Sequence, residues 1–360
     1  MILNSTVVEQ TIDRDTRGRF AKELVLVRAP SSTHADGVPL AMIRKRNADN
    51  AGGTIGTVVL LHGYGQNRYA WHLPARSLFN HLAHAGFDVF NLELRGHGRS
   101  RHLGAHPPNH VTTFVEEDVP AAIEEVQRLA GPRPVFLVGH SLGGLVAYAS
   151  AAKLQDAIGG VATLGSPYQF THGSWALAIL GSAMLALDRR VSFGHGGIEL
   201  KPLMESVRLL RSFIESPAFL FPIRGFAPGA LEPHVLAQHM SLAMDVGSVA
   251  VLRGMFHSAA EARRGGHCLG QLSNYAAGFE SLEDLPLLII SGTKDDLAPP
   301  ASVIPAYERS HSRDKTYRTF PRGHLDLLIG RDSPQTIWPL LESWLSRRAR
   351  RLDARSPAAA

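Results

Sequence analysis

Three residue types that together perform nucleophilic catalysis follow one another along the chain: a serine, an aspartate and a histidine. The serine is Ser141, the central residue of 139–143, which reads Gly-His-Ser-Leu-Gly. It follows the apolar run PVFLV at 134–138 and precedes a helical pattern. This context predicts a sharp strand-to-helix turn that raises the serine hydroxyl out of a sheet. A serine in that position could attack a carbonyl carbon.

A serine hydroxyl is a weak nucleophile at neutral pH, so it needs a base and an acid that orients the base. The acid is predicted after the apolar strand LPLLIISG, where Asp295 and Asp296 follow Gly292. We prefer Asp295, because a turn that starts at Gly292 should aim its fourth residue at the end of the sheet. The predicted base is His324, which directly follows the last strand, whereas His311 precedes that strand.

Two backbone N–H groups are candidates for stabilising the negative charge that develops on a substrate oxygen. The sequence LLHGYG at 60–65 ends a predicted strand in a glycine-flanked turn, which can present the N–H of Tyr64. The second candidate is the N–H of Leu142, directly after the nucleophile. His62 is predicted to be a structural hydrogen-bonding residue, because it precedes the serine and duplicates His324.

Short apolar runs alternate with longer helical patterns, which indicates a mostly parallel, doubly wound sheet in an α/β protein. Buried strands are predicted at 57–61, 88–93, 135–138, 161–164, 287–290 and 316–320. An antiparallel edge is predicted from 23–28 and 40–44. Helices are predicted at 73–85, 114–130, 142–154 and 334–347. This order places the three catalytic candidates beyond the ends of different strands.

Between about 168 and 281 the alternation stops, and the pattern becomes helical with several interrupting prolines. We interpret 168–281 as a helical cap or lid inserted into a core domain formed by 1–167 and 282–360. The stretch 175–187 is almost wholly apolar but shorter than the roughly 20 residues that span a bilayer. It is either a helix buried against the core or a lid over an apolar pocket, and these two interpretations are compatible.

The composition indicates a globular protein with a large core, because 44% of the 360 residues are hydrophobic and 19% are charged. Cys268 is the only cysteine, and the first twenty residues lack the apolar stretch of an export signal. We therefore expect a cytoplasmic protein. The net charge of +5 includes an arginine-rich tail at 346–356, which we interpret as a solvated helix end. Membrane contact by this tail stays open, and nucleic acid is not an expected partner, because no aromatic residues interleave with the arginines.

Histidines are frequent between 62 and 110, but their positions lack the spacing of zinc ligands with carboxylates. We therefore expect no metal and no cofactor. The expected partner is a small-molecule ester, and the sequence predicts no oligomeric state.

Five ordered segments resemble the α/β-hydrolase family: HGYG at 62–65, NLELRGHGRS at 91–100, GHSLGG at 139–144, GTKD at 292–295 and GH at 323–324. The resemblance implies the α/β-hydrolase fold, a triad of Ser141, Asp295 and His324, and a cap that selects the substrate. Two segments, 83–101 and 324–334, are also similar to acid lipases and polyhydroxyalkanoate synthases. The synthases carry cysteine where this chain has serine, which favours hydrolysis over polymer transfer, and acid lipases are exported.

The ordered triad predicts a serine esterase or lipase-like enzyme that forms an acyl-enzyme, and the apolar cap predicts a medium or long apolar acyl group. An acyltransferase or a thioesterase acting on a hydrophobic acyl substrate would use the same residues and stays an alternative. Dehalogenases and epoxide hydrolases that resemble this chain carry aspartate in place of Ser141. A catalytically silent binding protein is expected to lack at least one triad residue.

Overall fold

The computed structural model describes residues 1–31, 35–50, 52–170, 197–216, 219, 224–262 and 268–355. The strands are β1 (Ile2–Asp13), β2 (Thr16–Ala29), β3 (Val38–Asn47), β4 (Thr57–Leu61), β5 (Asp88–Glu93), β6 (Val135–His140), β7 (Ile158–Leu164), β8 (Gly197–Glu199), β9 (Val246–Ser248), β10 (Leu287–Gly292) and β11 (Lys315–Phe320). The α-helices are α1 (Leu78–His84), α2 (Gly98–His102), α3 (Val119–Ala130), α4 (Leu142–Leu154), α6 (Lys201–Leu209), α7 (Arg211–Ile214), α8 (Pro233–Gln238), α9 (Val249–Ala262), α10 (Ala276–Glu280), α11 (Pro300–Val303), α12 (Pro305–Arg309), α13 (Asp326–Ile329) and α14 (Ser333–Arg355). Short 3-10 or π-helical turns lie at Arg68–Ala70, Phe114–Asp118, Gln155–Ala157, His239–Ala243 and Gly270–Tyr275.

One large sheet organises the chain, with nine strands in the order β1-β2-β3-β5-β4-β6-β7-β10-β11. The strands from β5 to β11 in this order are parallel to their neighbours, whereas β1, β2 and β3 pair antiparallel. This arrangement confirms the predicted, mostly parallel sheet with an antiparallel edge. β1 is absent from the predicted strands, because most of this edge strand is exposed and its sequence lacks the alternation of a half-buried strand.

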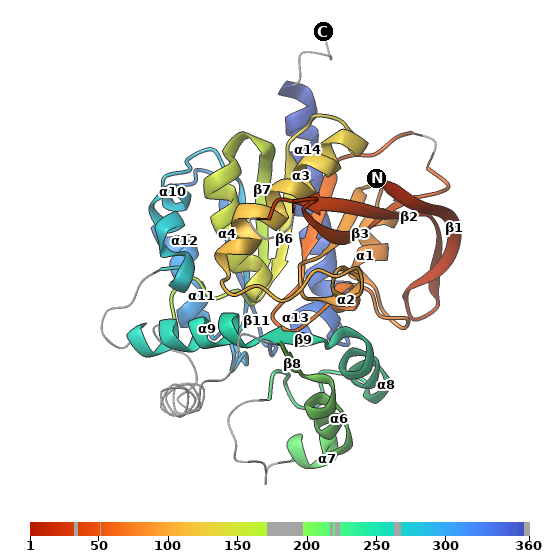
Figure 1. The fold of residues 1–360 in the computed structure, drawn as a ribbon. Helices are drawn as coiled ribbons and strands as arrows, with labels where there is room; N and C mark the ends of the chain where they lie inside the picture. The colour runs from red at the N-terminus through yellow and green to blue at the C-terminus, as the bar shows by residue number, and fades with distance from the viewer. Residues whose placement is uncertain are drawn as a thin grey trace.

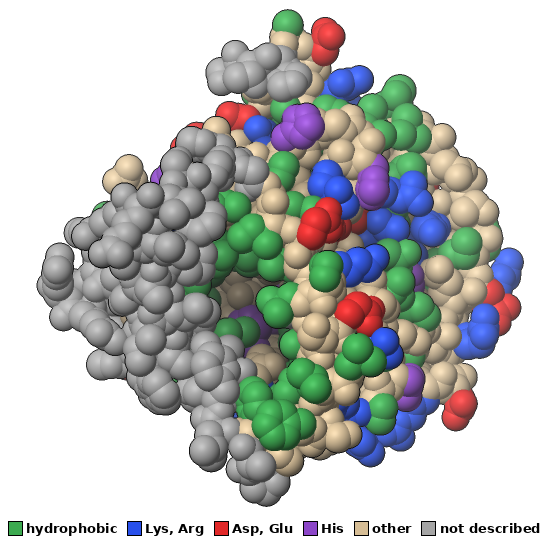
Figure 2. All heavy atoms as spheres, turned by 60° about the horizontal axis from the view of Figure 1, so that its bottom comes forward, with side chains coloured by type: hydrophobic (Ala, Val, Ile, Leu, Met, Phe, Trp, Pro, Cys, Tyr) green, Lys and Arg blue, Asp and Glu red, His purple; other side chains and the backbone are tan. Residues whose placement is uncertain are grey.

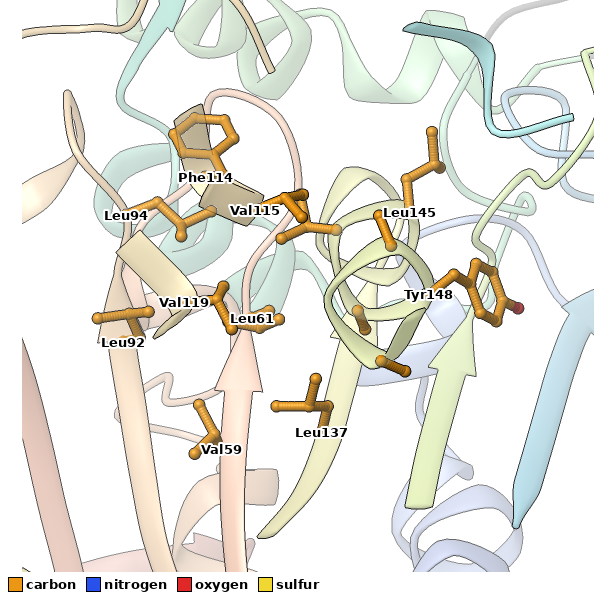
Figure 3. Packing of buried hydrophobic residues seen from close by; sticks show 14 of the residues in the cluster. Val59, Leu61, Leu92, Leu94, Phe114, Val115, Val119, Leu137, Leu145 and Tyr148 are labelled. Carbon is orange, nitrogen blue, oxygen red and sulfur yellow. The ribbon is translucent and has the colours of Figure 1, made fainter. Parts of the chain in front are cut away.

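Alternate side chains of the strands fill two cores, one on each face of the sheet. In β4, Val59 and Leu61 belong to the core that α3 and α4 cover, whereas Val58 and Leu60 belong to the core that α1 and α14 cover. Figure 3 shows the first core from close by, with Leu145 of α4 above the strands. Because both faces are packed, the ends of the parallel strands form a firm base for side chains placed beyond them.

The helix boundaries follow local capping signals more closely than the apolar pattern. α4 coincides with the predicted 142–154, and α14 extends well beyond the predicted 334–347. α1 is shorter than the predicted 73–85, because the Ser77 hydroxyl accepts a hydrogen bond from the Asn80 N–H and so begins the helix at Leu78.

The described residues between 168 and 281, called the cap segment below, contribute no strand to the large sheet. β8 and β9 pair only with each other, and most of the other elements in this range are helical. Figure 1 shows β8, α6, α7 and α8 at the bottom of the molecule, below the large sheet. The apolar stretch 175–187 lies outside the described residues, and the cap boundaries stay a prediction. Within the ranges that the structure describes, no helix is long and apolar enough to cross a membrane.

Candidate active site

Ser141 lies in the tight turn between β6 and α4. Its backbone has φ 53° and ψ −121°, a conformation that residues other than glycine rarely adopt. The turn is held in place because the Ser141 N–H donates to the Leu164 carbonyl at 3.1 Å. Gly143 lets α4 begin against β4, since a Cβ there would lie 2.1 Å from the Leu61 oxygen. The serine is thus held at the tip of the predicted strand-to-helix turn.

The turn 62–65 lies directly beside Ser141. A Cβ added to Gly63 would lie 3.2 Å from the Ser141 Cβ. The N–H groups of Tyr64 and Leu142 have no hydrogen-bond acceptor among the described residues. The Leu142 N–H has no acceptor because the first N–H groups of a helix have no partner within the helix. The two loops beside Ser141 therefore each carry a free backbone donor, as stabilisation of an oxyanion requires.

Asp295 and His324 form a buried hydrogen-bonded pair, in which His324 Nδ1 lies 2.8 Å from Asp295 Oδ2. The other carboxylate oxygen accepts hydrogen bonds from the N–H groups of Leu297 and Ala298 at 2.9 and 2.7 Å. Gly165 lies against the pair, since a Cβ there would be 3.0 Å from Asp295 Oδ2 and 3.2 Å from His324 Nδ1. These contacts fix the orientation of the imidazole ring.

The serine turn and the histidine loop meet through His140. The ring centroids of His140 and His324 are 4.6 Å apart, and His140 Nε2 lies 3.3 Å from the His324 carbonyl oxygen. Among the described residues, no hydrogen bond joins the Ser141 hydroxyl to His324. Such bonds are often long without substrate and shorten in the reacting complex.

The pKa values of the two neighbouring histidines are shifted in opposite directions. Burial lowers the pKa of His324, but the charge and hydrogen bond of Asp295, with the charges of Asp296 and Asp326, outweigh burial and raise it above 6.5. Burial lowers the pKa of His140 well below 6.5. His324 is therefore the one of the two that can take up a proton near neutral pH.

His62 is held as a neutral ring. Its Nδ1 lies 2.9 Å from the Gly63 carbonyl, and its Nε2 accepts a hydrogen bond from the Leu94 N–H at 3.2 Å. Burial and the neighbouring His97 lower the pKa of His62 to about 3. These bonds fit the structural role predicted for this residue.

Gln66 and His239 lie in the same polar cluster, and neither is among the predicted site residues. Gln66 Oε1 accepts a hydrogen bond from the Gly63 N–H at 3.0 Å, which steadies the turn that carries Tyr64. Because its oxygen is used in this way, the Gln66 amide nitrogen donates to His239 Nε2, 3.3 Å away. Gln66 could have been found from its place directly after HGYG, whereas His239 lies 173 residues farther along the chain and its sequence surroundings give no signal.

Figure 2 shows a hollow in the face that forms the bottom of Figure 1, with hydrophobic side chains along its border and a histidine inside it. The described residues contain no group of three His, Cys, Asp or Glu side chains arranged to hold a metal ion. The arrangement of Ser141, His324 and Asp295 itself offers nucleophilic attack, proton transfer and stabilisation of a protonated imidazole.

Comparisons with known proteins identify the fold of the chain. The family described as alpha/beta hydrolase fold matches residues 56–191. The monoacylglycerol lipase of Paleococcus ferrophilus superposes with a TM-score of 0.57 at 21% identity, covering 86% of this chain and 99% of the lipase. The chain has the α/β-hydrolase fold. The more specific similarity to acid lipases and polyhydroxyalkanoate synthases stays a prediction.

Curated relatives of this α/β-hydrolase-fold protein include a hydrolase and an esterase. The (E)-2-((N-methylformamido)methylene)succinate hydrolase of Acinetobacter baylyi is 28% identical over 181 residues, which are 48% of this chain and 64% of the relative. The pimeloyl-[acyl-carrier protein] methyl ester esterase of Vibrio cholerae is 34% identical over 119 residues, which are 33% of this chain and 40% of the esterase. Epoxide hydrolases also match part of the chain. The chain spans less than two thirds of the length of these relatives.

Proposed function

We propose that this chain is a serine hydrolase that cleaves carboxylic esters, with Ser141 as nucleophile, His324 as base and Asp295 as the orienting acid. The observation that carries the proposal is the buried His324–Asp295 hydrogen bond of 2.8 Å beside the serine turn. The esterase among the relatives supports the same reaction class. A serine at the tip of the turn distinguishes the chain from hydrolases that form the ester intermediate on aspartate.

The reaction proceeds in two steps that use one base twice. Ser141 Oγ attacks the carbonyl carbon while its proton passes to His324 Nε2, and the oxyanion accepts hydrogen bonds from the N–H groups of Tyr64 and Leu142. The bond to the alcohol oxygen then breaks, and that oxygen takes the proton from His324. Water next loses a proton to His324 and attacks the acyl carbon; the bond to Ser141 Oγ then breaks, and that oxygen takes the proton back from His324 as the acid is released. Asp295 accepts the Nδ1–H throughout.

The substrate is an ester with a medium or long apolar acyl group, as the hydrophobic border of the hollow supports (Figure 2). On p-nitrophenyl esters, kcat/KM is expected to rise by about tenfold or more from acetyl to octanoyl, because burying only two of the added methylenes contributes about 1.6 kcal/mol, at about 0.8 kcal/mol each. A fluorophosphonate probe is expected to label one peptide, the one containing Ser141, and heat-unfolded protein is the control. A preference for acetyl would overturn the apolar acyl group, and absence of the label on Ser141 would overturn the hydrolase.

Activity is expected to fall on the acid side of neutrality. His324 must be neutral to accept the serine proton, and its raised pKa lies above 6.5. The pH profile of kcat/KM should therefore rise through a pH above 6.5 and level off beyond it, since this profile reports groups of the free enzyme. A profile that stays flat down to pH 5 would contradict the assignment of His324 as the base.

A further inference from the structure

A short stretch of the cap segment, 224–227, lies on the two loops that carry the proposed acid and base. Asp296 accepts two hydrogen bonds from this stretch, from the Arg224 N–H at 2.5 Å and from the Gly225 N–H at 3.0 Å. Both of its carboxylate oxygens are used. The carboxylate next to the proposed catalytic acid is therefore committed to the cap segment and not to the imidazole.

The histidine loop is bonded to the same stretch from its other side. Asp326 Oδ2 accepts hydrogen bonds from the Ala227 N–H at 2.7 Å and from the Gly323 N–H at 2.8 Å. The Leu325 N–H donates to the Gly225 carbonyl at 2.9 Å. Gly323 leaves no space between the two segments, since a Cβ there would lie 2.6 Å from the Ala227 nitrogen. Leu325 and Asp326, which follow His324, are thus hydrogen-bonded to the cap segment, and Gly323, which precedes it, is packed against Ala227.

The acid loop and the histidine loop are also bonded to each other. The Thr293 N–H donates to the Phe320 carbonyl at 2.8 Å, and the Lys294 N–H donates to the Arg322 carbonyl at 3.0 Å. The two loops and 224–227 therefore form one closed hydrogen-bonded unit.

We propose that Asp296 and Asp326 are positioning residues that couple the cap segment to the His324–Asp295 pair, so that the base is aligned for catalysis only while 224–227 is docked on both loops. This inference rests on the proposed function, because it assigns a task to residues around that same triad. Neither carboxylate needs to touch the substrate.

Both positioning carboxylates are poorly solvated. Burial raises the pKa of Asp326 to about 6, although hydrogen bonds from Ala227 and Gly323 and the charge of Arg322 oppose this. Burial likewise raises the pKa of Asp296.

The negative charges of Asp296 and Asp326 contribute to the raised pKa of the proposed base, His324. The titratable groups that act on or beside His324 are Asp295, Asp296, Asp326, His140 and His239. Because the two histidines have lowered pKa values and are neutral near pH 7, the carboxylates determine the local charge. Removing one negative charge should therefore lower the pKa of His324.

The test compares Asp326→Ala with Asp326→Asn. The alanine variant leaves two backbone N–H groups without an acceptor, so kcat is expected to fall by between about tenfold and a hundredfold, the usual effect of a misplaced catalytic group. The asparagine variant keeps an oxygen for both N–H groups but loses the charge. Its kcat at the optimal pH is expected to stay within about threefold, while the acid limb of kcat/KM moves to lower pH.

Asp284→Asn is the matched control, because its side chain is 87% exposed and precedes β10 at the opposite end of the sheet. It should change neither kcat nor the pH profile. The inference is overturned if Asp326→Asn leaves the acid limb unchanged, or if a folded Asp326→Ala variant keeps kcat within twofold. If the alanine variant does not fold, the pH profile of the asparagine variant decides. Hydrolysis that survives Ser141→Ala would instead overturn the proposed function, so the two failures are distinguishable.

Discussion

Replacing Ser141 with alanine is expected to lower kcat for ester hydrolysis by a factor on the order of 10⁶, the effect of removing the nucleophile from a triad. The reason is chemical, because the substitution removes the hydroxyl that the turn holds beside Gly63. The variant should still fold and bind substrate, since the turn is held by backbone contacts that the substitution keeps. The measurement is kcat on the preferred p-nitrophenyl ester, with the thermal midpoint of unfolding measured alongside.

Ser150→Ala is the matched control for this experiment. Ser150 lies on the same helix, α4, and its buried hydroxyl has no hydrogen-bond partner among the residues that the structure describes. Its removal should leave kcat within about twofold, because it leaves no polar atom newly unpaired. If both variants hydrolyse the ester as fast as the parent chain, the nucleophile lies elsewhere.

Replacing Asp295 with asparagine is expected to lower kcat by about 10⁴-fold, because an amide cannot hold the imidazole in the required tautomer or stabilise the imidazolium. The acid limb of kcat/KM should also move to lower pH, because the charge and hydrogen bond of Asp295 raise the pKa of His324. Substrate binding should change little, since Asp295 is buried behind His324. A kcat and KM comparison at several pH values tests this.

The variant Asp296→Asn tests whether Asp295 or its neighbour Asp296 is the acid that orients the base. Asp296 contacts the backbone of Arg224 and Gly225, not the imidazole, so this variant loses one backbone hydrogen bond and is expected to reduce kcat by about tenfold or less. If Asp296→Asn were the more damaging substitution, the preference for Asp295 would be wrong.

Much of the fold could be predicted from sequence because its buried strands are short apolar runs between helical patterns. β4 and β5 have the predicted ends, 57–61 and 88–93, because both strands are buried along their whole length. β1 could not be predicted in this way, since an exposed edge strand needs no apolar face. The start of α1 was displaced by the Ser77 cap, which is a local hydrogen bond and not a periodic pattern.

The part of the candidate site that could be predicted consists of residues of a catalytic type that directly follow a strand of the parallel sheet. Asp295 and His324 were found because each follows a strand of the same parallel sheet, and the ends of such strands meet at one edge. The structure brings those two side chains into hydrogen-bond contact, while their catalytic roles stay a proposal. His239 and the stretch 224–227 could not be predicted, because their proximity to the triad depends on how the cap segment docks.

The backbone of Ser141, with φ 53°, places one residue under two opposing demands. A side chain in such a conformation costs on the order of 1–3 kcal/mol, and glycine would adopt it without that cost. The residue that would make the folded state more stable at this position is therefore not the residue that the proposed catalysis needs. Replacing Ser141 with glycine should therefore raise the thermal midpoint of unfolding while it removes the proposed nucleophile.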